Sequence, residues 1–199
     1  MLYKKRKYFK EVSKGLGYAF SRLPISPNQW TLLSLLLAII VFYFLVNQNF
    51  LISFVVCIFA ISIDMIDGAV ARASNRVTKF GAYLDTVTDR FIEFFIIFGL
   101  FFIDYPGFIL GPKIWLMILF FGSMISTYSK SAAFEKGLIR KEAKGGGILE
   151  HTDRLLLFLI IILISYFSLQ YATYLIVLTS VLTLVSFAQR FRIFTKRYI

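Results

Sequence analysis

Apolar residues fill six long runs of this chain, and short polar segments separate the runs. The runs cover residues Pro27 to Val46, Phe50 to Ala73, Gly81 to Ile103, Lys113 to Phe134, Thr152 to Phe167 and Tyr171 to Gln189. Most are close to the roughly 20 residues that a helix needs to cross the hydrocarbon core of a membrane, and the fifth is the shortest. The pattern predicts an all-α integral membrane protein with six transmembrane helices.

A different pattern precedes the first run. Phe9, Val12 and Leu16 recur at helical spacing, and Lys10 and Lys14 lie on the opposite side. The segment has no continuous apolar stretch and no small-residue cleavage site, which argues against a secretory signal peptide. We expect an N-terminal amphipathic helix that lies in the cytoplasmic interface of the membrane.

The start of the first span carries a capping signal. Ser26 precedes Pro27, and Gln29 follows Ser26 by three residues, as in a capping box with proline at the first helical position. The predicted organisation is one membrane domain over residues 1–199, with an interfacial helix and connector over 1–24, a six-helix bundle over 25–190 and a basic tail over 191–199.

Basic residues orient the predicted spans, because segments kept in the cytoplasm retain lysine and arginine. Of the 22 lysines and arginines, only Lys113, where a predicted loop meets the fourth run, lies on the side opposite the N-terminus. Both termini are therefore expected in the cytoplasm of a multi-pass cell-membrane protein. The net charge of +11 fits this topology and attraction to anionic membrane lipid, so nucleic acid is not expected as a partner.

Four aspartates interrupt the second and third runs. Asp64 and Asp67 are three residues apart in the second run, and Asp85 and Asp89 are four residues apart in the third. Each pair therefore lies on one face of its helix. Charge inside a membrane is costly and usually marks function. Carboxylates without a nearby thiolate favour magnesium, manganese or calcium over zinc, so the two faces are expected to meet around a divalent cation.

The aspartates belong to a longer motif, Asp-x2-Asp-Gly-x2-Ala-Arg-x8-Gly-x3-Asp-x3-Asp, which fixes eight positions between residues 64 and 89. At every one of these positions it resembles the signature of the CDP-alcohol phosphotransferase family. The resemblance implies a six-helix membrane enzyme that moves a phosphoalcohol from a CDP-linked donor to a second alcohol and releases CMP. It also implies a homodimer. The predicted topology places the aspartates near the cytoplasmic ends of the second and third spans, so the active site is expected on the cytoplasmic side.

Within that resemblance the aspartates take separate roles. Asp64, Asp67 and Asp85 are expected to hold Mg²⁺ or Mn²⁺, which neutralises the donor pyrophosphate. Asp89 is expected to take the proton from the attacking hydroxyl, a role that the family also implies for the last aspartate, and it can share the metal. A salt bridge to Arg90 is the alternative explanation for Asp89.

The nucleotide is assigned to the remaining motif residues. Gly68, Ala71 and Gly81 leave a bare face that fits a flat base and ribose. Arg72 offers a guanidinium to phosphate, and Asp67 completes the predicted CDP-binding set. Small residues also mediate helix packing in membranes, which is the alternative explanation for the glycines.

Three basic residues near the cytoplasmic ends of other spans are candidates for binding the acceptor. They are Lys130, Arg154 and Arg190. Three cations at one level would bind a phosphate, and their surroundings resemble the branch of the family that uses inositol phosphate. For each one alone, an anchor at a helix end is the alternative. His151 could act as a ligand, but a histidine at a loop end is expected to be solvated and is left out of the site.

The expected reaction transfers a phosphatidyl- or archaetidyl-type group from a CDP-linked lipid to inositol 1-phosphate and releases CMP. Glycerol 3-phosphate is the alternative acceptor. A divalent-cation transporter is the alternative from another class of protein. The acids cluster at one membrane level and no inverted repeat is apparent, which argues against transport.

Overall fold

The computed structural model describes residues 15, 17–139 and 147–195. Six long helices make up most of this part: α2 (Pro27–Val46), α3 (Phe50–Ala73), α4 (Lys79–Phe101), α5 (Pro112–Glu135), α6 (His151–Phe167) and α7 (Leu169–Thr195). Apart from an isolated bridge between Phe108 and Leu110, the described residues form no β-structure. The predicted all-α class is confirmed.

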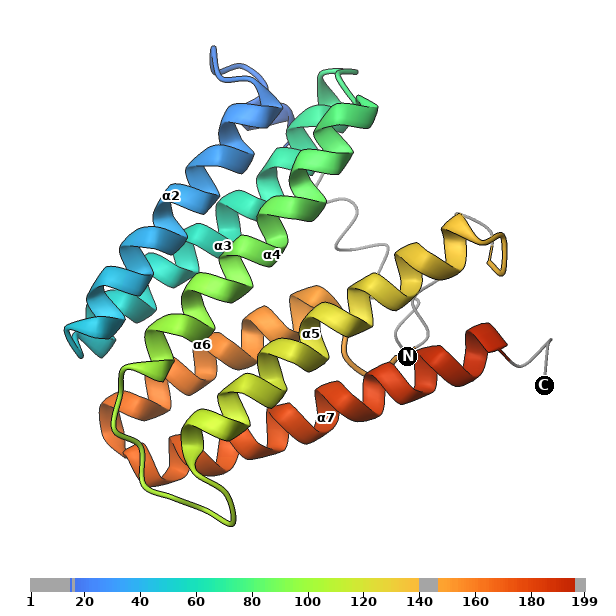
Figure 1. Ribbon diagram of the computed structural model, residues 1–199. Helices are drawn as coiled ribbons and strands as arrows, with labels where there is room; N and C mark the ends of the chain where they lie inside the picture. The colour runs from blue at the N-terminus through green and yellow to red at the C-terminus, as the bar shows by residue number, and fades with distance from the viewer. Residues whose placement is uncertain (1–14, 16, 140–146, 196–199) are drawn as a thin grey trace.

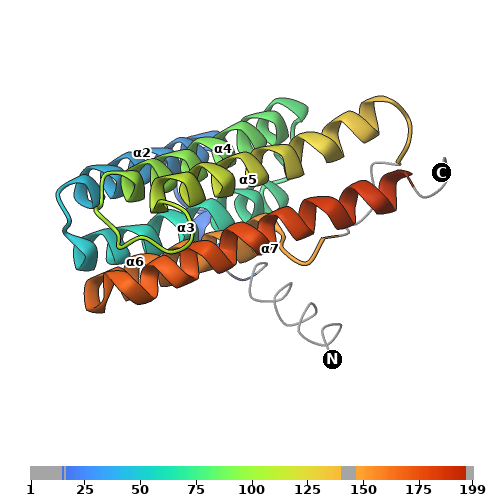
Figure 2. The same ribbon diagram turned by 60° about the horizontal axis from the view of Figure 1, so that its bottom comes forward.

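The helices form two groups of three. α2 packs against α3 and α4, and α7 packs against α5 and α6, as Figure 1 and Figure 2 show. Contacts of α3 with α6, and of α4 with both α5 and α6, join the two groups. The turn between α3 and α4 places the last part of α3 beside the first part of α4, where the aspartates lie.

Capping chemistry sets the helix starts. The Ser26 hydroxyl accepts a hydrogen bond from the Gln29 backbone N (3.3 Å), and Gln29 Oε1 accepts one from the Ser26 backbone N (2.7 Å), so the predicted capping box is confirmed. Thr78 caps α4 by accepting a hydrogen bond from the Gly81 backbone N at 2.9 Å. This cap starts α4 at Lys79, two residues before the predicted start.

One predicted boundary differs from the structure, and one predicted segment is only partly described. The predicted basic tail begins at residue 191, but α7 continues to Thr195, because Phe194 stays buried against the bundle one turn after Arg190. The predicted interfacial helix lies mostly outside the described residues. Residues 17–20 are helical, and Phe20 packs edge-on against Trp30 with ring centroids 5.5 Å apart. The helix therefore ends within residues 1–24, the range predicted for the interfacial helix and its connector.

One apolar core extends through both helix groups. Its fully buried members include Leu45 on α2, Ile92 and Ile96 on α4, and Phe158 on α6. The close approach of α2 and α4 depends on Gly99, since a Cβ there would lie 2.8 Å from Leu45 Cβ. Both helices are thereby held at a short separation near the end remote from the aspartates.

Apolar side chains also cover outward faces of the helices. On α2 the exposed side chains include Leu32, Leu36, Ile39 and Tyr43, which share one helix face. Such a face suits contact with lipid. By length and composition α2, α3 and α7 are able to cross a membrane. These three helices support the prediction of a membrane protein. The prediction of six membrane spans goes beyond what they show.

Candidate active site

The turn between α3 and α4 brings the two aspartate pairs together. Carboxylate oxygens of Asp64, Asp67 and Asp85 lie within 4.8 Å of one another. Ligand atoms of Asp64, Asp89 and His151 form a second set within the same limit. Because Asp64 belongs to both sets, the structure gathers all four predicted aspartates around one site.

The carboxylate oxygens of this site suit a divalent cation as ligand atoms. Asp64 Oδ1 is buried and has no hydrogen-bond partner among the described residues. A buried carboxylate oxygen without a partner is unfavourable, and a cation would supply the missing interaction. Carboxylate oxygens are the ligands that Mg²⁺ and Mn²⁺ prefer.

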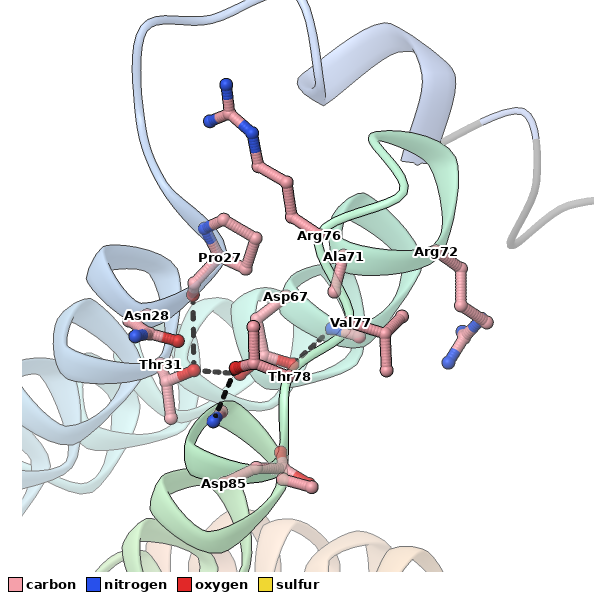
Figure 3. Close-up of a pocket in the computed structure, with 13 residues that line it drawn as sticks. Pro27, Asn28, Thr31, Asp67, Ala71, Arg72, Arg76, Val77, Thr78 and Asp85 are labelled. Carbon is pink, nitrogen blue, oxygen red and sulfur yellow. Dashed lines mark hydrogen bonds between the residues drawn. The ribbon is translucent and has the colours of Figure 1, made fainter.

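A residue outside the motif orients Asp67. The Thr31 hydroxyl donates a hydrogen bond to Asp67 Oδ2 at 2.5 Å, and both side chains are buried. The Gly68 backbone N donates to Oδ1 of the same carboxylate. Figure 3 shows Thr31 and Asp67 facing each other, with Asp85 nearby on α4. No sequence pattern indicates Thr31 as a site residue, because a threonine in an apolar helix ordinarily bonds to its own backbone.

A pocket of about 250 Å³ opens beside the aspartates. All five residues predicted to bind CDP line it: Asp67, Gly68, Ala71, Arg72 and Gly81. The predicted metal ligand Asp85 also lines it. Residues that the sequence did not indicate complete the walls: Pro27, Asn28 and Thr31 from α2, Arg76, Val77 and Thr78 from the α3–α4 turn, and Ala82 from α4 (Figure 3). The pocket therefore lies among three segments, of which the motif marks two.

The two motif glycines differ in what surrounds them. A Cβ on Gly81 would lie 3.1 Å from Thr78 Oγ1 and 3.2 Å from Asn28 Oδ1, which is a tight fit. For a Cβ on Gly68 the nearest atoms would belong to the Arg72 side chain, with Nη1 3.2 Å away, and that side chain can move. Gly81 thus allows α2 to approach, as the packing explanation expects, and it also lines the pocket.

Asp89 faces the ring of His151 and the guanidinium of Arg90. His151 Nε2 is 3.4 Å from Asp89 Oδ1, and Arg90 Nη2 is 3.6 Å from Oδ2, so the ion pair considered for Asp89 is present. The expectation of a solvated His151 is wrong. The side chain of Asp153 caps the start of α6 by accepting from the Glu150 backbone N (2.9 Å), and His151 begins the helix with its ring against α4.

The three predicted acceptor-binding cations lie in the second helix group. Arg154 is buried on α6 and donates from Nε and Nη2 to Glu93 Oε1, at 3.1 and 2.9 Å. Arg190 is buried on α7 and donates to the backbone oxygens of Ser126 (3.3 Å) and Leu149 (2.9 Å). Lys130 is half-buried on α5, one turn after Ser126.

Burial separates the arginines from ordinary anchors at helix ends. Anchoring side chains extend their charge into water or lipid headgroups, whereas Arg154 and Arg190 are 1% and 6% exposed. Each keeps one buried nitrogen, Arg154 Nη1 and Arg190 Nε, with no hydrogen-bond partner among the described residues. The sequence indicated both arginines but not Glu93, the carboxylate that holds Arg154.

Three phospholipid-synthesis enzymes are similar to this chain in sequence. The archaetidylinositol phosphate synthase of Pyrococcus horikoshii is 29% identical over 190 residues, 96% of this chain and 94% of that protein. The phosphatidylinositol phosphate synthase of Mycolicibacterium smegmatis is 31% identical over 162 residues, 78% of this chain and 69% of that protein. A CDP-diacylglycerol–glycerol-3-phosphate 3-phosphatidyltransferase of Aquifex aeolicus is 32% identical over 93 residues, 47% of this chain and 51% of that protein.

Solved structures share the fold. Mycobacterium tuberculosis phosphatidylinositol phosphate synthase with CDP-DAG bound superimposes with a TM-score of 0.78 at 23% identity, covering 93% of this chain and 94% of that chain. The complex of the same protein with manganese and citrate gives a TM-score of 0.77 at 24% identity, covering 92% and 88%.

The family assignment rests on the motif and on the length of the match. The eight motif positions lie within residues 64 to 89. The family model described as CDP-alcohol phosphatidyltransferase matches residues 24–186, which include the motif and five complete helices, α2 to α6. The chain is an enzyme of the CDP-alcohol phosphatidyltransferase family.

Proposed function

We propose that this enzyme transfers a phosphoalcohol group from a CDP-linked lipid to inositol 1-phosphate and releases CMP. The observation that carries the choice of a phosphorylated acceptor is a buried arginine, Arg154, that is linked to Asp89 through Glu93 and His151. Arg154 and His151 both contact Glu93 Oε1, and His151 also reaches Asp89. The proposed phosphate-binding arginine is therefore linked to the proposed base, Asp89, by three successive contacts that pass through Glu93 and His151.

The unpartnered arginine nitrogens favour an anionic acceptor. A buried N–H without an acceptor is unfavourable, and Arg154 Nη1 and Arg190 Nε are both in that state among the described residues. Phosphate oxygens would satisfy them, because guanidinium groups form strong charge-assisted hydrogen bonds with phosphate. Lys130 adds a third positive charge on α5. A neutral acceptor such as inositol would leave these donors unpaired.

The relatives support inositol phosphate as the acceptor. The two relatives named for inositol phosphate products match 96% and 78% of this chain, whereas the relative named for glycerol 3-phosphate matches 47%. Glycerol 3-phosphate is the second candidate acceptor, since it also carries the phosphate that the arginines would bind.

The motif residues divide the chemistry. Asp64, Asp67 and Asp85 would hold Mg²⁺ or Mn²⁺, which neutralises the pyrophosphate and stabilises departing CMP when bound. Asp67, Gly68, Ala71, Arg72 and Gly81 bind the CDP group in the pocket that they line. Asp89 accepts the proton of the attacking hydroxyl. Its place in the second ligand set, with Asp64 and His151, also allows it to share the cation.

The proposal includes an orientation in the membrane, with both termini and the aspartates on the cytoplasmic side, and a homodimer. In a Cys57→Ala background, Lys136→Cys is expected to react with an impermeant reagent only from the cytoplasmic side, and Asp104→Cys only from the other side. Both side chains are exposed. The reverse labelling contradicts the orientation, and a monomeric mass in native detergent contradicts the homodimer.

The identity of the acceptor is tested by supplying one candidate acceptor at a time. Purified enzyme is incubated with CDP-lipid and Mg²⁺, and CMP release is measured with inositol 1-phosphate, glycerol 3-phosphate, inositol or serine. We expect the fastest release with inositol 1-phosphate and none above background with inositol or serine. Equal rates with inositol and inositol 1-phosphate contradict a phosphate site, and release in excess chelator contradicts the metal.

A further inference from the structure

Glu93 is a buried carboxylate that lies one turn after Asp89 on α4, outside the aspartate motif. Its side chain is fully buried. Its partners come from three helices: Arg90 on α4, Ser123 on α5, and His151 and Arg154 on α6. Burying a carboxylate with several cations requires close geometry from every partner, so such a group is more costly than an apolar side chain of the same size. This cost points to a role beyond packing.

Glu93 and Asp89 hold the same two side chains between them. His151 Nδ1 is 2.8 Å from Glu93 Oε1, and its Nε2 is 3.4 Å from Asp89 Oδ1. Arg90 Nη1 is 2.9 Å from Glu93 Oε2, and its Nη2 is 3.6 Å from Asp89 Oδ2. Arg90 Nη2 also lies 2.8 Å from His151 Nδ1. Each oxygen of Asp89 therefore faces a group that Glu93 fixes at its other end.

The same carboxylate sets the orientation of Arg154. Glu93 Oε1 accepts hydrogen bonds from Arg154 Nε and Nη2. The guanidinium is planar, so these two bonds determine where its third nitrogen points. That nitrogen, Nη1, is the one with no partner among the described residues. Glu93 thus determines which nitrogen of Arg154 remains available.

We propose that Glu93 and His151 are positioning residues of the transfer reaction. Glu93 holds His151 against Asp89 and holds Arg154 with Nη1 open, so the proton-accepting carboxylate and the acceptor's phosphate site keep a fixed separation. The proposal rests on the proposed functions of Asp89 and Arg154. Small displacements of reacting groups slow chemistry strongly while substrate binding elsewhere continues. Loss of either residue should therefore affect turnover more than donor binding.

The test uses two substitutions in the full-length enzyme, Glu93→Gln and His151→Asn. Turnover and the KM for CDP-lipid are measured with whichever acceptor the parent enzyme uses best, and Mn²⁺ affinity is measured separately. We expect kcat to fall by about tenfold to a hundredfold in both variants, as for other residues that orient a site. Donor KM and Mn²⁺ affinity should stay within about twofold, because neither residue lines the CDP pocket and neither belongs to the proposed metal ligands Asp64, Asp67 and Asp85. Failure of inositol 1-phosphate as substrate does not affect this comparison.

Tyr105→Phe is the matched control. It removes a buried hydrogen bond to Ser165 Oγ (2.8 Å) at the far end of α6, and kcat should be unchanged. Two results overturn the proposal: parental kcat in both variants, or donor KM and Mn²⁺ affinity that change as much as kcat, which indicates general damage. If Glu93→Gln does not fold, His151→Asn decides alone, since its side chain is 20% exposed and tolerates change better.

Discussion

The Thr31 hydroxyl on α2 donates a hydrogen bond to Asp67 Oδ2 on α3 at a distance of 2.5 Å. Both side chains are buried, and the Gly68 backbone N donates a hydrogen bond to the other carboxylate oxygen of Asp67. The orientation of a motif aspartate thus depends on a helix that carries none of the motif. Because α2 also supplies Pro27 and Asn28 to the pocket, it is one wall of the active site.

Replacing Thr31 by valine keeps the shape of the side chain and removes its hydroxyl. Asp67 then loses a charge-assisted hydrogen bond worth about 1.5–3 kcal/mol. We expect kcat/KM for CDP-lipid to fall by about tenfold to a hundredfold, while Thr31→Ser retains most of the activity. The measurement is CMP release at varied CDP-lipid concentration. Parental kinetics in Thr31→Val show that Thr31 does not orient the site.

Gly81→Ala tests the CDP pocket. The added methyl group would lie 3.1 Å from Thr78 Oγ1 and 3.2 Å from Asn28 Oδ1. Overpacking of this kind costs about 1–3 kcal/mol, and the same groups line the pocket. We expect the KM for CDP-lipid to rise while the acceptor KM stays unchanged. Gly107→Ala is the control, because a Cβ there meets nothing within 4 Å. An unchanged donor KM in Gly81→Ala removes this residue from the pocket.

Local sequence signals predicted the start of α2 and the course of the long helices. Ser26 and Gln29 form the predicted capping box because all the atoms involved lie within one turn. The aspartate pairs were also predictable, since helical spacing places each pair on one face and a short turn joins the two helices. These features depend on residues that are close together in the chain.

Long-range contacts could not be predicted in this way. Glu93 and His151 are 58 residues apart, and Thr31 and Asp67 are 36 apart, so their meeting depends on how the helices pack. His151 was expected in water because it stands at the end of a predicted loop. In the structure Asp153 turns back to cap α6, which leaves His151 facing α4. No periodicity in the sequence distinguishes a His151 in water from a His151 that faces α4.

Substitutions of two aspartates should separate metal binding from proton transfer. Asp64→Asn is expected to lose Mn²⁺ binding and activity together, because Asp64 is common to both sets of ligand atoms. Asp89→Asn is expected to keep Mn²⁺ and CDP binding and to lose transfer, because an amide cannot accept the hydroxyl proton. Mn²⁺ binding and CMP release are measured on the same preparations. If Asp89→Asn also loses Mn²⁺, Asp89 is a metal ligand and the base assignment is wrong.

The acceptor site is tested by Arg190→Ala and Lys130→Ala. Loss of a charge-assisted hydrogen bond to phosphate, about 1.5–3 kcal/mol, should raise the acceptor KM by roughly tenfold to a hundredfold. Arg154→Lys is the milder change at the third position, because removing the charge would leave buried Glu93 underpaired. Arg192→Ala, exposed on the same helix as Arg190, is the control and should behave as the parent. An equal rise in the KM for CDP-lipid argues that these residues do not form an acceptor site.

The central claim is transfer of the lipid group to inositol 1-phosphate, and competition tests it most directly. CDP-lipid and Mg²⁺ are supplied with equal concentrations of inositol 1-phosphate, glycerol 3-phosphate, inositol and serine. The lipid products are then separated and quantified by mass spectrometry. Their ratios give the ratios of kcat/KM for the competing acceptors. We expect the inositol phosphate lipid to exceed every other product by at least about tenfold, which corresponds to about 1.4 kcal/mol of discrimination. A product mixture dominated by the glycerol phosphate lipid, or by the lipid of unphosphorylated inositol, contradicts the claim.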